Sequence, residues 1–166
     1  MIHLLKEIKA SLSPSCILLD CRAGLHDLGG LAVQRLSHLN VVFGLDSDQS
    51  WQGLRLVIRQ MSMSERLPDC LMIQALEPPP SEIRERSRNR FLTDSYDAFL
   101  EYYYEHPDAG SSPDIGNTDA PHYPFHMPYE TSLAGYRSLR DVAEILTNEH
   151  LREFTALLAR RVGKAI

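Results

Sequence analysis

Hydrophobic positions at helical spacing open the chain. Leu4, Leu5, Ile8 and Leu12 recur every three or four residues, and Pro14 ends that segment. The same period returns after residue 50. The apolar face there consists of Trp51, Leu54, Val57, Ile58 and Met61. The pattern therefore predicts two amphipathic helices in the first half of the chain.

Uninterrupted apolar runs lie before and after the second of these helices. The first two fall at residues 16–20 and 40–46 and end in an acid, Asp20 and Asp46, and the third, at 70–73, lies within residues 68–76. Such runs are typical of strands that are buried on both faces of a parallel sheet. With a short fourth strand at 123–127, the alternation of helix and strand predicts a three-layer α/β fold whose mostly parallel sheet has about four strands.

The second half of the chain is more polar. Ser81 is the expected N-cap of a long helix that runs to about Tyr104. Residues 106–123 are rich in Pro, Asp, Gly, Ser and Asn, which predicts a flexible surface loop at about 106–123. Two further helices are predicted at 132–146 and 150–162. The loop is not a domain boundary, so residues 1–166 are expected to form a single α/β domain.

Composition excludes several classes of protein. The formal net charge is -5, which argues against nucleic acid as a partner, and no apolar run approaches the length of a membrane-spanning helix. The first residues are amphipathic and include Glu7, unlike a secretion signal. The three cysteines, Cys16, Cys21 and Cys70, lie in or beside apolar runs, which predicts reduced, buried thiols and a cytoplasmic location.

Ligands of parallel sheets bind beyond the carboxyl ends of the strands. Asp20, Asp46, Gln74 and Pro128 are all predicted to lie at that edge. A carboxylate at the end of a strand, such as Asp20, suits Mg²⁺, and Gly24 lets the backbone approach a phosphate. The alternative is that Asp20 caps a turn and Gly24 supplies a positive φ angle.

Three sequence blocks resemble the ParA/MinD-type P-loop ATPases. Residues 17–30, Ile-Leu-Leu-Asp-Cys-Arg-Ala-Gly-Leu-His-Asp-Leu-Gly-Gly, are similar to the Walker B and switch region of the branch with an Asp-Ser-Arg-Thr-Gly pattern. Residues 41–46 and 49–54 resemble the next strand of that branch and its helix beginning Gln-Ser-x-x-Gly. Residues 127–134 resemble the late segment in which a strand ends in Pro-Tyr and leads to Leu-Ala. The resemblance implies an incomplete P-loop NTPase fold.

The resemblance also implies roles for residues of the first block. Asp20 would assist Mg²⁺, Gly24 would lie near the γ-phosphate of ATP, and Asp27 would orient a water molecule or form part of the switch. Cys21 and Ala23 depart from the pattern, because they replace hydroxyl residues of this branch. The polar contacts of the switch are therefore in question.

In the later blocks, the resemblance implies a pocket for the adenine base. Gln74 falls near the position where the family reads the base with an amide, and Pro128 and Tyr129 would border the same pocket.

The motif Gly-x-x-x-x-Gly-Lys-[Ser/Thr] does not occur, and the lysines are Lys6, Lys9 and Lys164. A phosphate cradle needs successive backbone N–H groups and a lysine near the β- and γ-phosphates. We therefore expect the Walker B and switch side of a nucleotide site, completed by Mg²⁺ and ATP only together with a missing N-terminal part. The chain alone is expected not to hydrolyse ATP, whether it is a fragment, a split-gene product or a degenerate paralogue.

Two other functions remain open at this stage. One is a non-catalytic protein-interaction module with a degenerate NTPase fold, and the other is a small-molecule site that uses the edge with Asp20 and Asp46. In the family that the chain resembles, the strand at 16–20 lies beside the phosphate-loop strand, so the resemblance implies that one side of it lacks a neighbour here. Its unpaired backbone groups would then pair with a second copy or a partner protein, or the N-terminal helix at 2–12 would fold over and cover them.

Two clusters of side chains are assigned to the surface. The first combines His106, His122 and His126 with Asp108, Asp114 and Asp119. Its irregular spacing favours a solvated loop over a zinc site. Arg84, Arg86, Arg88 and Arg90 alternate with acids and are expected to form a solvated helix face.

Overall fold

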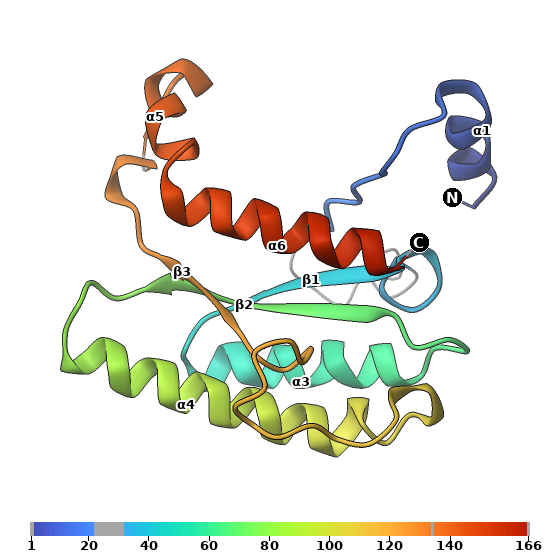
Figure 1. The fold of residues 1–166 in the computed structure, drawn as a ribbon, viewed down its shortest axis with the longest axis horizontal. Coiled ribbons are helices and arrows are strands. Elements are labelled where there is room, and N and C mark those ends of the chain that lie inside the picture. The colour runs from blue at the N-terminus through green and yellow to red at the C-terminus, as the bar shows by residue number, and fades with distance from the viewer. Residues whose placement is uncertain (1, 22–31, 134, 166) are drawn as a thin grey trace.

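The computed structural model describes residues 2–21, 32–133 and 135–165, which contain a parallel sheet between two layers of helices (Figure 1). Its strands are β1 (Leu39–Gly44), β2 (Asp69–Glu77) and β3 (Phe125–Pro128), hydrogen-bonded in the order β1-β2-β3. Both strand pairs are parallel. The predicted three-layer α/β fold is confirmed.

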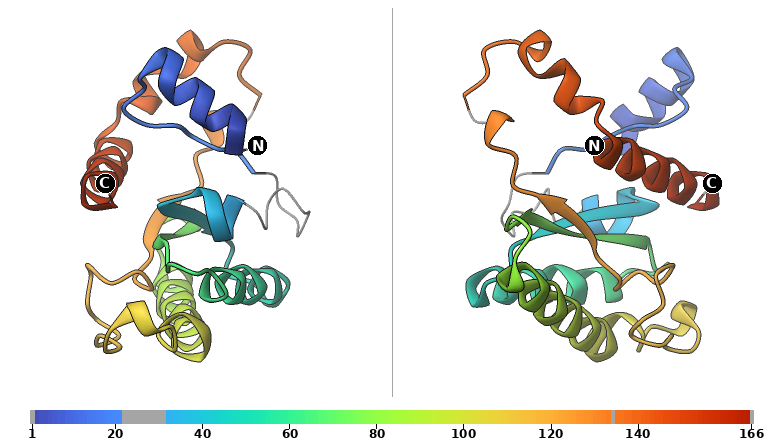
Figure 2. Two further views of the ribbon diagram at one scale, coloured as in Figure 1. Left: turned by 90° about the vertical axis from the view of Figure 1, so that its right-hand side faces the viewer. Right: turned by 60° about the vertical axis from the view of Figure 1, so that its left-hand side comes forward.

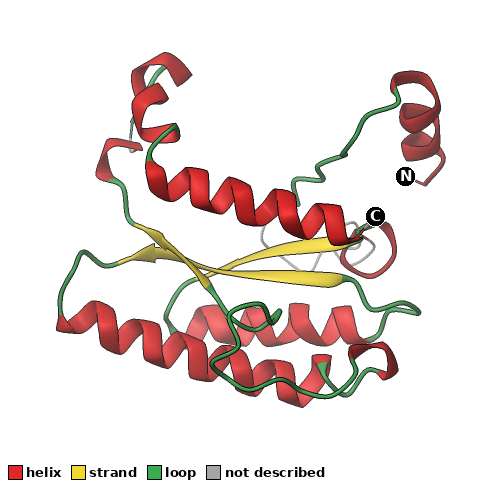
Figure 3. Cartoon of the chain, in the orientation of Figure 1, coloured by secondary structure: helices red, strands yellow, loops and turns green. Residues whose placement is uncertain are grey.

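Two helices cover one face of the sheet, α3 (Asp48–Ser62) and α4 (Glu82–Ala98) (Figures 1 and 3). Each begins at a serine whose side chain accepts a backbone hydrogen bond, Ser47 from the N–H of Ser50 and Ser81 from the N–H of Arg84. These hydroxyls satisfy backbone donors that would otherwise have no partner in the first helical turn.

The core forms where α3 and α4 pack against the sheet. The apolar face of α3 is buried, as predicted, and the ring of Trp51 lies 4.8 Å from that of Phe91 in α4. The buried residues are Val42, Trp51, Leu54, Ile58, Met61, Cys70, Met72, Phe91, Ala98, Phe99 and Tyr103. This core fixes α4 against β2 and so determines which α4 side chains reach the end of the sheet.

On the other face of the sheet lies α6 (Glu149–Ala165) (Figures 1 and 2). Its Arg161 is buried and donates through Nη2 to the backbone oxygen of Asp119 at 2.6 Å. The remaining helices are α1 (Ile2–Leu12) and α5 (Ala143–Leu146), with short π-helical segments at Ala32–Leu36 and Phe99–Tyr103 and 3-10 turns at Pro107–Ala109, Thr131–Leu133 and Leu139–Val142. No helix in the described ranges is both long and apolar enough to cross a membrane.

The loop predicted at 106–123 is attached to the body near its end. His122 is fully buried, its backbone oxygen accepts a hydrogen bond from Ser95 Oγ at 2.7 Å, and its Nδ1 lies 2.6 Å from Tyr104 Oη. The His122 Nε2 also lies 3.0 Å from the backbone oxygen of Ile115. Flexibility of this loop stays a prediction.

The prediction of a strand at 16–20 is wrong. These residues form no strand, and Leu18 is 83% exposed. An apolar run becomes a buried strand only where other elements cover its faces and another strand pairs with its backbone, and the described part of the chain provides neither here. Cys16 and Cys21 are accordingly exposed rather than buried, whereas Cys70 in β2 is buried as predicted.

The predicted helix at 132–146 is also wrong as a single element. Gly135 has a φ angle of 84°, which a right-handed helix does not tolerate, and helical structure resumes only at Leu139. The capping box of Ser138 and Asp141 starts this second part. The N-terminal helix α1 is found as predicted, but none of its residues is buried and it stands away from the sheet (Figure 2).

Candidate functional site

The carboxyl edge of the sheet, on the left in Figure 1, brings together polar residues that belong to β2 and β3 or directly follow β1. Gly44, the last residue of β1, pairs with Gln74 in β2, and Gln74 pairs with His126 in β3. Asp46 follows β1 directly, and Pro128 is the last residue of β3. The sequence prediction that Asp46, Gln74 and Pro128 share this edge is therefore confirmed.

A β-bulge in β2 shapes this edge. Gln74 pairs with His126 but Glu77 pairs with Pro128, so that β2 has one residue more than β3 between the two pairs. Leu76 takes up the irregularity with a φ angle of 55°, in the left-handed region that side chains other than glycine rarely adopt. Strand residues that are three apart normally face opposite sides of a sheet. Here Gln74 and Glu77 are both buried and both contact side chains of α4.

A hydrogen-bonded chain of side chains links β3, β2 and α4. His126 Nδ1 lies 2.7 Å from Gln74 Oε1, and Gln74 Nε2 donates to Ser87 Oγ at 2.8 Å. An amide oxygen accepts only, so Nδ1 of His126 carries the hydrogen in this arrangement. Gln74 is 1% exposed, and both ends of its amide are used within the protein.

Asp46 and Arg90 extend the polar edge on the side of β1. Arg90 donates to the Asp46 carboxylate through Nε at 2.8 Å and also through Nη2. Burial alone raises the pKa of Asp46, but hydrogen bonds from Arg90 and from the hydroxyl of Ser87 outweigh it and hold the pKa below its usual value. Asp46 is therefore a charged, paired carboxylate.

Glu77 and Arg88 form an ion pair beneath the edge. The Glu77 side chain is 2% exposed, and Arg88 donates to both of its oxygens, with Nη2 at 3.0 Å from Oε2. Glu77 Oε1 also lies 3.9 Å from His126 Nδ1. A bidentate guanidinium compensates the cost of burying this carboxylate.

His126 is held neutral in these surroundings. Burial, followed by the positive charge of Arg88, lowers its pKa to about 4, although Glu77 opposes the shift. Its backbone oxygen lies 2.6 Å from Nε2 of His150, which ties β3 to α6. Its ring is thus an uncharged imidazole near pH 7.

The other residues predicted from sequence are not part of this cluster. Asp20 is exposed in a segment without regular structure, and Gly24 and Asp27 lie outside the described residues. Pro128 and Tyr129 are exposed at the end of β3, where the Tyr129 N–H donates to the backbone oxygen of Glu77 at 3.0 Å. The structure therefore brings Gln74, Pro128 and Tyr129 to one edge, whereas Asp20 belongs to no strand of the sheet.

The histidines considered for a metal site serve other contacts. His106 Nε2 lies 3.0 Å from the backbone oxygen of Ser64, and both ring nitrogens of His122 have partners. Within residues 2–21, 32–133 and 135–165, no group of three or more His, Cys, Asp or Glu residues is arranged to hold a metal ion.

The prediction of a solvated arginine face is wrong for two of its members. Arg88 is half-buried and ion-paired with Glu77, and Arg84 is half-buried with its Nε 3.9 Å from the Glu85 carboxylate. Arg90 is ion-paired with Asp46, but its side chain stays exposed, as predicted. The spacing of residues along α4 indicates which arginines lie beside its buried face. Ser87 and Phe91 lie one turn apart on the buried face of α4, and Arg84, Arg88 and Arg90 flank that face.

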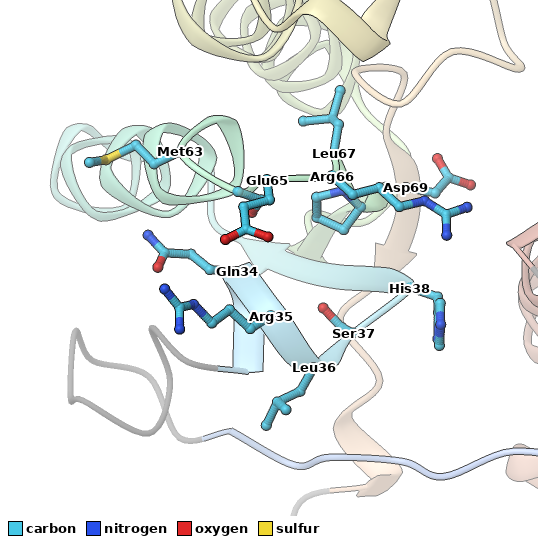
Figure 4. A pocket seen from close by; sticks show the side chains of 12 residues that line it. Gln34, Arg35, Leu36, Ser37, His38, Met63, Glu65, Arg66, Leu67 and Asp69 are labelled. Carbon is cyan, nitrogen blue, oxygen red and sulfur yellow. The ribbon is translucent and has the colours of Figure 1, made fainter. Parts of the chain in front are cut away.

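A cavity of about 640 Å³ lies at the opposite, amino-terminal edge (Figure 4). Residues 34–38 and 63–69, which precede β1 and β2, line it. The guanidinium groups of Arg35 and Arg66 point away from each other (Figure 4). The side chain of Gln34 is hydrogen-bonded to that of Gln60 in α3. The side chains that line the cavity do not converge on a ligand, so we take the carboxyl edge as the candidate site.

Comparison of the chain with protein-family models, with curated proteins and with solved structures finds no match.

Proposed function

We propose that this chain supplies the Walker B and switch side of a ParA/MinD-like nucleotide site and does not hydrolyse ATP by itself. The observation that carries the proposal is the row of polar residues along the carboxyl edge of a parallel sheet, from Asp46 through Gln74 to His126. In open parallel sheets this edge is where ligands bind.

The resemblance of three sequence blocks supports the same function. Two of them include residues of this edge, Asp46 in one and Pro128 and Tyr129 in the other. Asp20 belongs to the proposed site only if residues 16–20 move to the sheet, where its carboxylate would assist Mg²⁺. In the bound state Pro128 and Tyr129 would border the base. A cytoplasmic location, where ATP and Mg²⁺ are abundant and exposed thiols stay reduced, is part of this proposal.

Lack of hydrolysis follows from the chemistry of phosphoryl transfer. Catalysis there depends on positioning and on charge stabilisation by a lysine, backbone N–H groups and Mg²⁺. The 166 residues contain no Gly-x-x-x-x-Gly-Lys-[Ser/Thr] motif to supply them. An assay of phosphate release with ATP and Mg²⁺ tests this point, with Asp20→Ala as the matched variant. Steady release from the wild type that Asp20→Ala abolishes would refute it.

One observation favours a second candidate, a non-catalytic interaction module. In the described part of the chain, no strand pairs with the outer side of β1, and Phe43 on this strand is 57% exposed. Such an edge is a template for pairing with another chain. Binding of a partner protein that Phe43→Lys abolishes, together with no detectable nucleotide binding, would favour this candidate over the first.

A further inference from the structure

Gln74 positions another residue rather than a ligand. Its amide oxygen is occupied by His126 Nδ1 at 2.7 Å and its amide nitrogen by Ser87 Oγ at 2.8 Å, and the side chain is shielded from solvent. To contact a base directly, Gln74 would have to break one of these buried bonds and leave a polar group without a partner. The contact that the resemblance implies for Gln74 is therefore already used inside the protein.

The same bond fixes the protonation of His126. Because Gln74 Oε1 can only accept, Nδ1 is the donor, and in a neutral ring Nε2 is then a bare acceptor. In the described part of the chain no hydrogen bond to this Nε2 is found, and the His126 side chain is 19% exposed. Nε2 is thus an acceptor that a ligand can reach.

We propose that Nε2 of His126, oriented by Gln74 and Ser87, accepts a hydrogen bond from the exocyclic amine of an adenine base bound at the carboxyl edge. The inference rests on the proposed nucleotide site and names the group that reads the base. In it, Gln74 is a positioning residue and His126 is the binding residue.

The ligand class follows from two neighbouring features. A bare imidazole nitrogen selects a donor, which adenine presents as its exocyclic amine. Tyr129, the residue directly after β3, is 53% exposed and offers a flat ring of the kind on which bases stack. A planar ligand that carries an N–H donor can both donate to His126 Nε2 and stack on the ring of Tyr129.

Charged groups from two elements, α4 and β2, act on the protonation of His126. Arg84 and Arg88 from α4 oppose protonation, whereas Glu77 from β2 and Glu85 from α4 favour it. From α6, His150 contacts the backbone oxygen of His126 rather than its ring. The effects of burial and of the two arginines are the larger, so the pKa of His126 is lowered.

The experiment uses the full chain, two ligands and two variants. ATP and the triphosphate of purine riboside, which lacks only the exocyclic amine, are titrated calorimetrically at pH 7 with Mg²⁺. His126→Asn keeps an amide N–H near the position of Nδ1 and removes the acceptor, whereas His126→Gln places an amide oxygen near the position of Nε2. ¹⁵N NMR of the histidine rings reports the tautomer independently of any ligand.

The proposal predicts a wild-type ring with hydrogen on Nδ1 only, and about a tenfold preference for ATP over the purine analogue. His126→Asn is expected to lose this preference and His126→Gln to retain part of it. Hydrogen on Nε2, or equal affinity for the two ligands, overturns the role of His126 but leaves the nucleotide site intact. If neither ligand binds the wild type at millimolar concentration, the proposed nucleotide site itself is overturned, whatever the tautomer.

Discussion

Stability is expected to fall as the pH falls below about 6.5, because His126 must stay neutral in the folded protein. Its pKa is about 4 in the fold against an ordinary value of 6.5. Between these values the unfolded chain binds a proton that the folded chain does not, so the contribution is fully present above 6.5 and is lost on the way down to 4. The side chain is 19% exposed, so solvent weakens the effect only modestly.

The size of the effect follows from the same two pKa values. Each unit of difference corresponds to about 1.4 kcal/mol, so His126 accounts for a loss of roughly 2–3 kcal/mol between pH 7.5 and pH 4.5. His122 also has a lowered pKa and adds to the loss, whereas the raised pKa of Asp94 opposes it. Comparison of the wild type with a variant that lacks the His126 ring isolates the contribution of His126 to this loss of stability.

Urea denaturation at pH 7.5 and pH 4.5 provides the measurement. His126→Asn removes the titrating ring and keeps an N–H for Gln74, so its loss of stability over this range is expected to be smaller than that of the wild type by roughly 2–3 kcal/mol. His3→Asn is the control, because the His3 side chain is 88% exposed. Equal losses in the wild type and His126→Asn would refute the reasoning.

Three further predictions concern the backbone and the surface. Leu76 is exposed and has a left-handed backbone conformation that glycine adopts without strain. Leu76→Gly is therefore expected to stabilise the fold by about 1 kcal/mol, and Leu76→Ala is not. Thermal unfolding in which both variants lose stability would contradict this. Gly44→Ala brings a Cβ to 2.4 Å from Cδ1 of buried Leu54 and is expected to cost about 1–3 kcal/mol. Gly53→Ala in α3 meets no atom and is expected to gain about 0.5–1 kcal/mol, so equal effects of the two alanines in denaturant titrations would disprove the packing argument. Residues 16–20 expose apolar side chains, Leu18 above all, so the chain is expected to self-associate through this segment. Light scattering should show smaller particles for Leu18→Lys, and a monomeric wild type at high concentration would exclude this association.

The hydrophobic pattern of the sequence was sufficient to predict α3 and the strand before Asp46. The face of α3 that holds Trp51 and Ile58 repeats at helical spacing, and the buried run before Asp46 is a strand, as both patterns predict. The run at 16–20 is similarly apolar, but it pairs with no strand in the described part of the chain. Composition records how apolar a segment is, and it does not record whether a neighbouring strand is present.

The sequence predicted which residues lie at the edge of the candidate site, but it did not predict their hydrogen-bond partners. Strand ends placed Asp46, Gln74 and Pro128 at one edge, since parallel strands align their carboxyl ends. The partners of Gln74 depend on the bulge at Leu76 and on the rotation of α4, which bring Ser87 and His126 to it. Those contacts join segments far apart in the chain, and no local pattern encodes them.

Titration of the ¹⁵N-labelled chain with ATP and Mg²⁺, followed by NMR, tests the central claim most directly. If the carboxyl edge is the nucleotide site, the resonances that shift first belong to residues around Gln74, His126 and Tyr129, and those around Arg35 and Arg66 at the other edge stay unchanged. Shifts confined to the amino-terminal cavity, or none at saturating ATP, would contradict the account.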